Sequence, residues 1–245
     1  MTLQELLEYF FRLYGRRNRI FLPSLVDRIN FLNLAISDLQ DAVRKSYGSE
    51  IRQIAFARIT ARIFCVAEYL GSPLALVEMV IRKYGGGCAY CHRNPCGCGE
   101  RHGKLVLPAT VSQQQTRWGI RQFQSNLNNV FGEANRKRGV EYVLNRLSRE
   151  IAELLSLAMS PGAHGESIEG IYEKYAEELA DTFAWTLTAA NFLDVDVHDA
   201  TRLRYTNGCW KCSRCPCVCM EFDVRQVDWS EIESQMRREP RRVTV

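Results

Sequence analysis

Several features that define specialised classes of protein are missing from this 245-residue sequence. No apolar run approaches the roughly 20 residues of a membrane span, and the N-terminal stretch "MTLQELLEYFFRLYGRR" has acidic residues where a signal peptide needs basic ones. No stretch alternates apolar and polar residues with the two-residue period of a strand. The formal net charge is only +4, which does not by itself indicate a nucleic-acid partner. We therefore expect an all-α, cytoplasmic protein with no membrane association.

Cysteine, by contrast, is abundant and concentrated in two short clusters. The segments "GGCAYCHRNPCGC" (86–98) and "NGCWKCSRCPCVC" (207–219) hold nine of the ten cysteines, and Cys65 is separate. In a reducing compartment such spacing indicates metal ligands before disulfides. Each cluster contains C-x2-C-x4-C-x-C, which supplies four thiolates for one structural Zn²⁺, with an iron–sulfur cluster as the alternative. The predicted ligands are Cys88, Cys91, Cys96 and Cys98, then Cys209, Cys212, Cys217 and Cys219; Cys215 is a spare thiol.

The two clusters are also evidence of an internal repeat. At a shift of 121 residues, Tyr84 aligns with Tyr205, and four cysteines and a proline also coincide without a gap. Further upstream, "YGRRNR" (14–19) resembles "FGEANR" (131–136). This indicates two homologous halves, 1–98 and 112–219, joined by a linker at 99–111. A C-terminal tail (220–245) follows, with one short helix expected near 229–238.

Each half has the apolar spacing of helices. In the second half, one stripe contains Phe123, Leu127, Val130 and Phe131, and further stripes follow in 140–155 and 179–192. Helix breaks are expected at "RKRG", "SPGAHGES" and "LDVD". The pattern predicts about four helices in each half.

Four acidic residues of the second half have a spacing that suits metal binding. Glu150 and Glu153 are three residues apart on one expected helix, and Glu178 and Asp181 are three apart on the next. Four crowded carboxylates would repel one another, and a divalent cation such as Mg²⁺ removes that repulsion. The competing interpretation is that they are solvated acids paired with Arg146, Arg149 or Lys174.

Together, ExxE, a spacer and ExxD resemble the MazG-like, all-α nucleoside triphosphate pyrophosphohydrolases, a family that includes the dimeric dUTPases. "FQSNLNNVFGEANRKRGVEYVLNRLSREIAELLSLA" is similar to that family's first two helices, and "EELADTFAWTLTAANFLDVDVHDA" to its next helix and turn. The resemblance covers about 120–205 well and 1–85 weakly. It implies Mg²⁺-dependent cleavage of a nucleoside triphosphate to a monophosphate and pyrophosphate. Glu150, Glu153, Glu178 and Asp181 would then be the catalytic metal ligands.

Substrate-binding candidates are basic or polar residues near this expected site: Arg202, Arg204, Arg136, Lys137 and Asn191. Roles for Asn18, Arg19 or Trp118 cannot be ranked from sequence. In the first half, Ala55 and Arg58 replace Glu178 and Asp181. We expect Arg58 to pair with Asp38 or Asp41 and to displace a metal. The first half is therefore predicted to be a degenerate copy, and the chain a pseudo-dimer.

Two other functions are left open by these observations. The chain could be a catalytically silent nucleotide sensor or scaffold. It could also bind nucleic acid through its cysteine loops, where Trp210, Lys211 and Arg214 could stack on bases and contact phosphates. The modest net charge argues against the nucleic-acid alternative. Self-association into a homo-oligomer is compatible with the sequence.

Overall fold

The computed structural model describes residues 1–71, 73–98, 107, 113–160 and 168–219, and the described residues form helices with no strand. The prediction of an all-α fold is confirmed. The elements are α1 (Leu3–Phe21), α2 (Leu25–Arg44), α3 (Ser49–Tyr69), α4 (Pro73–Tyr84), the 3₁₀ turn η1 (Gln115–Arg117), α5 (Ile120–Arg138), α6 (Val140–Met159), α7 (Ile168–Phe192) and α8 (Val197–Tyr205). We refer to α1–α4 as the N-terminal set and α5–α8 as the C-terminal set. The tail helix predicted near 229–238 and most of the predicted linker lie outside the described residues.

Local sequence explains where the helices begin and end. Thr2 and Glu5 form a reciprocal capping box at the start of α1, as Ser24 and Asp27 do at the start of α2. The Asp196 side chain accepts a hydrogen bond from the backbone N–H of Asp199 at the start of α8. The three breaks expected in the second half fall between α5 and α6, between α6 and α7, and between α7 and α8. Those boundaries are therefore confirmed.

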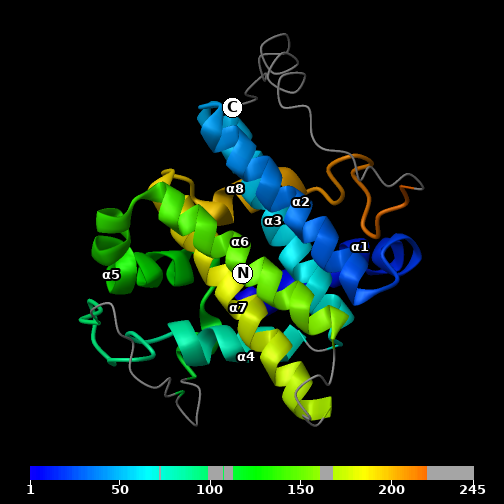
Figure 1. Ribbon diagram of the computed structural model, residues 1–245. Coiled ribbons are helices and arrows are strands. Elements are labelled where there is room, and N and C mark those ends of the chain that lie inside the picture. The colour runs from blue at the N-terminus through cyan, green and yellow to red at the C-terminus, as the bar shows by residue number, and fades with distance from the viewer. Residues whose placement is uncertain (72, 99–106, 108–112, 161–167, 220–245) are drawn as a thin grey trace.

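The core is built around α3 and α7, which run through the middle of the molecule (Figure 1). Both helices bury aromatic side chains where they meet, and the rings of Phe64 and Phe183 lie 6.4 Å apart between centroids. α2 packs on α3 and α6 packs on α7, while α2 and α6 also contact each other. Phe123 and Leu127 from the predicted stripe on α5 are buried, whereas Phe131 is only partly buried. Apolar burial along both central helices thus joins the two sets into one core.

The last helix of each set packs against the other set. α4 packs on α7, and α8 packs on α3. Further contacts also occur in matching pairs, since α1 packs on α3 as α5 packs on α7, and α1 packs on α4 as α5 packs on α8. The packing of α5 on α6 has no counterpart of similar extent between α1 and α2. Each set therefore lends its fourth helix to the other.

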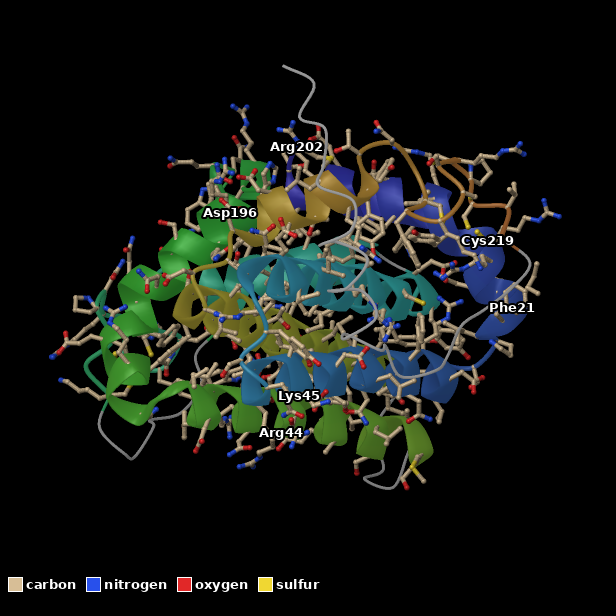
Figure 2. All side chains as sticks on the ribbon, turned by 90° about the horizontal axis from the view of Figure 1, so that it is seen from above. Phe21, Arg44, Lys45, Asp196, Arg202 and Cys219 are labelled. Carbon is tan, nitrogen blue, oxygen red and sulfur yellow. The ribbon has the colours of Figure 1, made fainter. Side chains whose placement is uncertain are left out.

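The two cysteine loops follow the same exchange. The backbone N–H of Cys96, in the first loop, donates to the carbonyl of Val130 on α5 at 2.8 Å. The N–H of Cys217, in the second loop, donates to the carbonyl of Leu13 on α1 at the same distance. Figure 1 shows the first loop beside α5 and the second loop, in orange, beside α1; Figure 2 shows Cys219 close to α1, whose last residue, Phe21, is also labelled. Each loop therefore closes over the first helix of the opposite set.

Among the described helices, none taken singly has both the length and the apolar character needed to cross a membrane. α1 and α2 meet that criterion only when they are taken together, as a pair bent by 113°.

Candidate active site and metal centres

Three of the four predicted carboxylates converge between α6 and α7. The i, i+3 spacing places Glu150 and Glu153 on one face of α6, and that face packs against α7 where it carries Glu178. One oxygen from each side chain lies within 4.8 Å of the others. Glu150 is almost fully buried, with 1% of its surface exposed. This group, Glu150, Glu153 and Glu178, is called the acidic cluster below.

The fourth predicted ligand, Asp181, is held by side chains of α4. Lys83 Nζ lies 2.6 Å from Asp181 Oδ1 and 3.0 Å from Glu177 Oε1. The Tyr84 hydroxyl donates to the same Asp181 oxygen at 2.6 Å. Lys83 is buried, so its charge is compensated mainly by these two carboxylates. Asp181 is thus tied to the N-terminal set and lies outside the group of three converging oxygens.

Sequence reasoning had no role for Lys83 or Glu177 at this site, and it used Tyr84 only to align the two cysteine clusters. Their proximity to Asp181 arises from the packing of α4 on α7, which joins residues about 95 positions apart in the chain. The spacing of apolar residues within one set does not indicate which helix of the other set will pack on it. The alignment of Tyr84 with Tyr205 was the one clue that this position matters.

Burial and mutual repulsion shape the acid–base properties of the cluster. Burial, with a contribution from the neighbouring carboxylates, raises the pKa of Glu150 to about 7 and that of Glu178 to about 8. Burial also raises the pKa of Asp181, while Lys83 acts in the opposite direction. Burial beside Asp181 raises the pKa of Tyr84 well above its ordinary value, so its hydroxyl stays protonated and can donate. Without a cation, the acidic cluster therefore holds protons near neutral pH.

Two arginines on α6 also pair with the cluster. Arg146 lies 2.9 Å from Glu150, and Arg149 lies 2.7 Å from Glu153, each one turn away along the helix. These are the partners expected if the acids were ordinary helix-face residues. The Glu153 pair is largely solvated, because the Arg149 side chain is 64% exposed. Burial of Glu150 and its contact with a second helix distinguish the cluster from a solvated acidic face.

The corresponding position in the N-terminal set is occupied by an ion pair. Arg58 on α3 lies 3.0 Å from Asp38 on α2, and the Asp38 side chain is 2% exposed. Asp41 pairs instead with Arg44 on its own helix and with Lys45, the residue that follows it. The predicted pairing of Arg58 with Asp38 is confirmed. A guanidinium lies here where the C-terminal set has an acid, and the groups of metal-ligating side chains found in the described residues do not include this place.

The predicted substrate-binding residues are spread over several surfaces. Asn191 and Gln124 exchange hydrogen bonds that tie α7 to α5, at 3.0 and 3.1 Å. Arg136 donates to Asn128, and Lys137 pairs with Glu133, all along α5. Asn191, Arg136 and Lys137 therefore each have a partner within the protein.

The structure also shows the surroundings of the two arginines of α8 and of Asn18, Arg19 and Trp118. Arg204 stacks on Trp210, and the exposed Arg202 lies at the edge of the molecule opposite Arg44 and Lys45 (Figure 2). α8 packs on α3 and α5. Both Asn18 and Arg19 contact Glu68. The Trp118 ring meets Phe123 edge-on.

The two cysteine loops bring their predicted ligands together. In each loop the four Sγ atoms lie within 4.8 Å of one another. The Cys88–Cys98 and Cys91–Cys96 pairs are 3.7 and 3.9 Å apart, and Cys209–Cys219 and Cys212–Cys217 are both 3.9 Å apart. Tetrahedral Zn–S bonds of about 2.3 Å hold sulfurs about 3.8 Å apart. Either loop can therefore hold one metal ion, and Cys215 is exposed outside its group.

The loop backbone favours the thiolate form that a metal requires. The backbone amides of Arg93 and Gly97 lower the pKa of Cys91 to about 6, and those of Val218 and Arg214 do the same for Cys212. The turn itself needs glycine at an equivalent place in both loops. A Cβ on Gly87 would lie 2.9 Å from the carbonyl oxygens of Arg93 and His92, and one on Gly208 would lie 2.9 Å from the backbone of Arg214. Gly208 also has a φ of +98°.

Comparison with known proteins gave no match to a family model, to a curated protein or to a solved structure.

Proposed function

We propose that this chain is a Mg²⁺-dependent nucleoside triphosphate pyrophosphohydrolase of the MazG-like type, with its active site at the acidic cluster. The observation that carries the proposal is the convergence of oxygens from Glu150, Glu153 and Glu178 within 4.8 Å, from two helices. Hard oxygen ligands in such a group suit Mg²⁺, which commonly binds one or two carboxylates together with substrate phosphates. The ExxE and ExxD spacing points to the same chemistry.

Each residue of the site has a role that follows from its position. Glu150, Glu153 and Glu178 would hold the metal, and one of the carboxylates would orient or deprotonate the attacking water. When bound, magnesium would polarise the phosphoryl oxygens and offset the charge that develops as the α–β bond breaks. Lys83 and Tyr84 fix Asp181 beside the cluster, and Lys83 brings a buried positive charge close to where the phosphates would lie. Residues of both sets thus contribute to one site.

We further propose that the chain is a tandem repeat folded as a pseudo-dimer. The matched helix contacts and the two exchanged cysteine loops support this interpretation. The Arg58–Asp38 pair gives the N-terminal set the character of a degenerate copy, because a guanidinium there opposes a cation. That set would nevertheless serve the reaction through α4.

The test is a hydrolysis panel. Purified protein is incubated with each common ribo- and deoxyribonucleoside triphosphate, with and without Mg²⁺, and pyrophosphate release is measured. We expect Mg²⁺-dependent release with at least one nucleotide. Glu150→Gln and Glu178→Gln should reduce release to the level without protein, because each removes a metal-binding charge. The matched control, Glu133→Gln, alters a solvated acid on α5 and should leave activity unchanged.

One observation favours a second candidate, the catalytically silent nucleotide-binding protein. Arg146 and Arg149 already contact two of the three clustered acids. If the panel gives no pyrophosphate while a nucleotide still binds saturably, the silent alternative replaces the enzyme.

We propose zinc as the metal of both cysteine loops. Four thiolates complete a tetrahedral shell and leave no open position, so the role would be structural. Sulfur separations of 3.7–3.9 Å match a single ion. An iron–sulfur cluster would spread its thiolates further apart, because they bind different irons.

A further inference from the structure

A separate cavity lies between the start of α3, the helix α8 and the second cysteine loop. Its volume is about 320 Å³ and its walls include the side chains of Gln53, Ile54, Arg204, Asn207 and Trp210. This volume is at the lower end of the range for small-molecule sites, about 300–1,000 Å³. The acidic cluster lies on α6 and α7, so this cavity is a different site.

The exchange symmetry shows what occupies the equivalent place in the other set. The 121-residue shift relates Arg204 to Lys83, and the alignment of Arg58 with Asp181 relates Ile54 to Glu177. Lys83 and Glu177 form an ion pair of 3.0 Å. Since Ile54 carries no charge, Arg204 cannot form the corresponding pair.

A second ion pair has been lost in the same way. Arg82 lies 3.6 Å from Glu173, and their counterparts are Leu203 and Glu50. Trp210 in turn replaces Ala89. The C-terminal cysteine loop has thus gained a large aromatic ring at a place where two bridging ion pairs are missing.

The cavity combines a stacking surface with hydrogen-bonding groups. The indole of Trp210 is 56% exposed, and the Arg204 guanidinium lies 4.5 Å from its ring centroid. The buried Nε atom of Arg204 has no hydrogen-bond partner among the described residues. Gln53 and Asn207 add amides that can both donate and accept. A planar aromatic face beside amide groups is the chemistry that recognises a nucleobase.

The charges lining the cavity limit how many phosphate groups the ligand can have. The carboxylate of Glu50 also lines the cavity and opposes the single positive charge of Arg204. A triphosphate would therefore meet little net positive potential, whereas a nucleoside or a monophosphate would bring little charge to neutralise.

We propose that this cavity, the Trp210 pocket, is a second ligand site that binds the nucleobase of a nucleoside or a nucleoside 5′-monophosphate. The base stacks on Trp210, its edge meets Gln53 and Asn207, and the ligand supplies an acceptor for the guanidinium N–H of Arg204. The site is independent of the proposed hydrolysis.

The pocket can be observed directly through its tryptophan. The sequence has four tryptophans, so protein labelled with 5-fluorotryptophan gives four ¹⁹F signals, and Trp210→Phe identifies the one from Trp210. Adenosine, guanosine, cytidine and uridine, and then their 5′-monophosphates, are titrated to millimolar concentration without Mg²⁺. We expect at least one to shift the Trp210 signal saturably. Comparing each nucleoside with its monophosphate shows whether the phosphate adds affinity.

Variants measured by equilibrium dialysis with the best of these compounds test the contacts. Trp210→Ala should weaken binding about tenfold or more, whereas Trp210→Phe keeps a stacking ring and should retain most of it. Ile54→Glu recreates the acid of the other set, so it should pair with Arg204 and weaken binding, while the uncharged Ile54→Gln should do so less. Tyr172→Ala removes an exposed aromatic ring from α7 and should have no effect. Circular dichroism confirms that each variant folds.

Three results would overturn the proposal. One is the absence of any saturable shift at Trp210 with all eight compounds. Another is binding that survives Trp210→Ala but is lost in Glu150→Gln, which would assign the nucleotide to the acidic cluster alone. The third is single-stranded oligonucleotide binding through Trp210 that is strongly salt-dependent and much tighter than that of any mononucleotide, which would make this surface a nucleic-acid groove.

Discussion

Lys83 and Arg58 are cations in related surroundings with different consequences. Arg58 pairs with Asp38 inside the N-terminal set, whereas Lys83 extends from α4 to two acids on α7. Lys83 compensates Asp181 and Glu177, whereas Glu150, Glu153 and Glu178 stay close together and two of them pair with arginines of their own helix. Arg58 therefore occupies the place of one potential metal site, whereas Lys83 lies beside the other and leaves its clustered acids in place.

Removal of the Lys83 charge should destabilise the protein. We expect Lys83→Met to lower the free energy of unfolding by about 3 kcal/mol, because it leaves the partly buried Asp181 without its cation, and protonation of Asp181 limits the loss. Lys137→Met removes a solvated partner of Glu133 and should cost under about 0.5 kcal/mol. Urea unfolding measures both. Equal effects would show that the Lys83 pair contributes no more than a surface pair, and Lys83→Met/Asp181→Asn should recover part of the loss.

The raised pKa values predict how pH controls magnesium binding. Glu150 and Glu178 have folded pKa values of about 7 and 8, above their ordinary value of 4.5, so without metal the folded state binds more protons than the unfolded state between about pH 4.5 and 8. That contribution to stability is present at low pH and is lost as pH rises through this window. Magnesium needs the deprotonated acids, so it should raise the melting temperature by several degrees more at pH 8.5 than at pH 6.

Thermal melts with and without Mg²⁺ at the two pH values provide the measurement. Glu178→Gln should abolish the difference, since it removes a ligand. A magnesium effect that is the same at both pH values would mean that the ion binds elsewhere.

At the scale of elements, each cysteine loop is the continuation of an exchanged helix. Lys83 and Tyr84 are the last two residues of α4, and Cys88 lies four residues after Tyr84. Asn126 on α5 donates to the carbonyls of Tyr84 and Gly86, at 2.7 and 3.0 Å, and fixes this connection. The first loop therefore helps to hold the end of α4 against the acidic cluster.

Loss of metal from one loop should have different effects in the two sets. Cys96→Ser/Cys98→Ser and Cys217→Ser/Cys219→Ser should each lower the zinc content from about two ions to about one per chain, measured by elemental analysis. Cys96→Ser/Cys98→Ser should also reduce pyrophosphate release about tenfold or more, because Lys83 and Tyr84 lose their anchor. A single misplaced group can lower a reaction rate about a hundredfold. Cys217→Ser/Cys219→Ser should reduce pyrophosphate release less. Iron with sulfide in place of zinc, or equal losses of activity, would contradict this account.

Sequence periodicity predicted the elements better than it predicted the site. The i, i+3 spacing of Glu150 and Glu153 and the cysteine spacing each act within one element or loop, so the convergence of their side chains could be predicted. Lys83 could not be predicted, because its contact with Asp181 depends on α4 crossing to the other set. The Trp210 pocket was missed for the same reason, since it requires α3 and α8 to meet.

At the scale of the whole molecule, the exchange makes the two sets depend on each other. α3 and α7 share buried aromatic contacts, and each is covered by the fourth helix of the opposite set. Either set alone would expose the apolar face that its partner's helix covers.

Division of the chain within 99–111 tests this dependence. We expect fragments 1–103 and 104–245 to aggregate or remain unfolded when expressed separately, and to form a folded 1:1 complex when expressed together. Size-exclusion chromatography and circular dichroism report both outcomes. A stable, monomeric fold from either fragment alone would show that the exchanged contacts are dispensable.

The exchange of α4 also determines which residues of the N-terminal set can change without affecting the acidic cluster. If the acidic cluster is the working site, α3 is free to lose its acids, as Ala55 and Arg58 illustrate. α4 has no such freedom, because Lys83 and Tyr84 serve Asp181 of the other set. Among related chains, drift should therefore be concentrated in α3, while the end of α4 changes as slowly as the acidic residues it contacts.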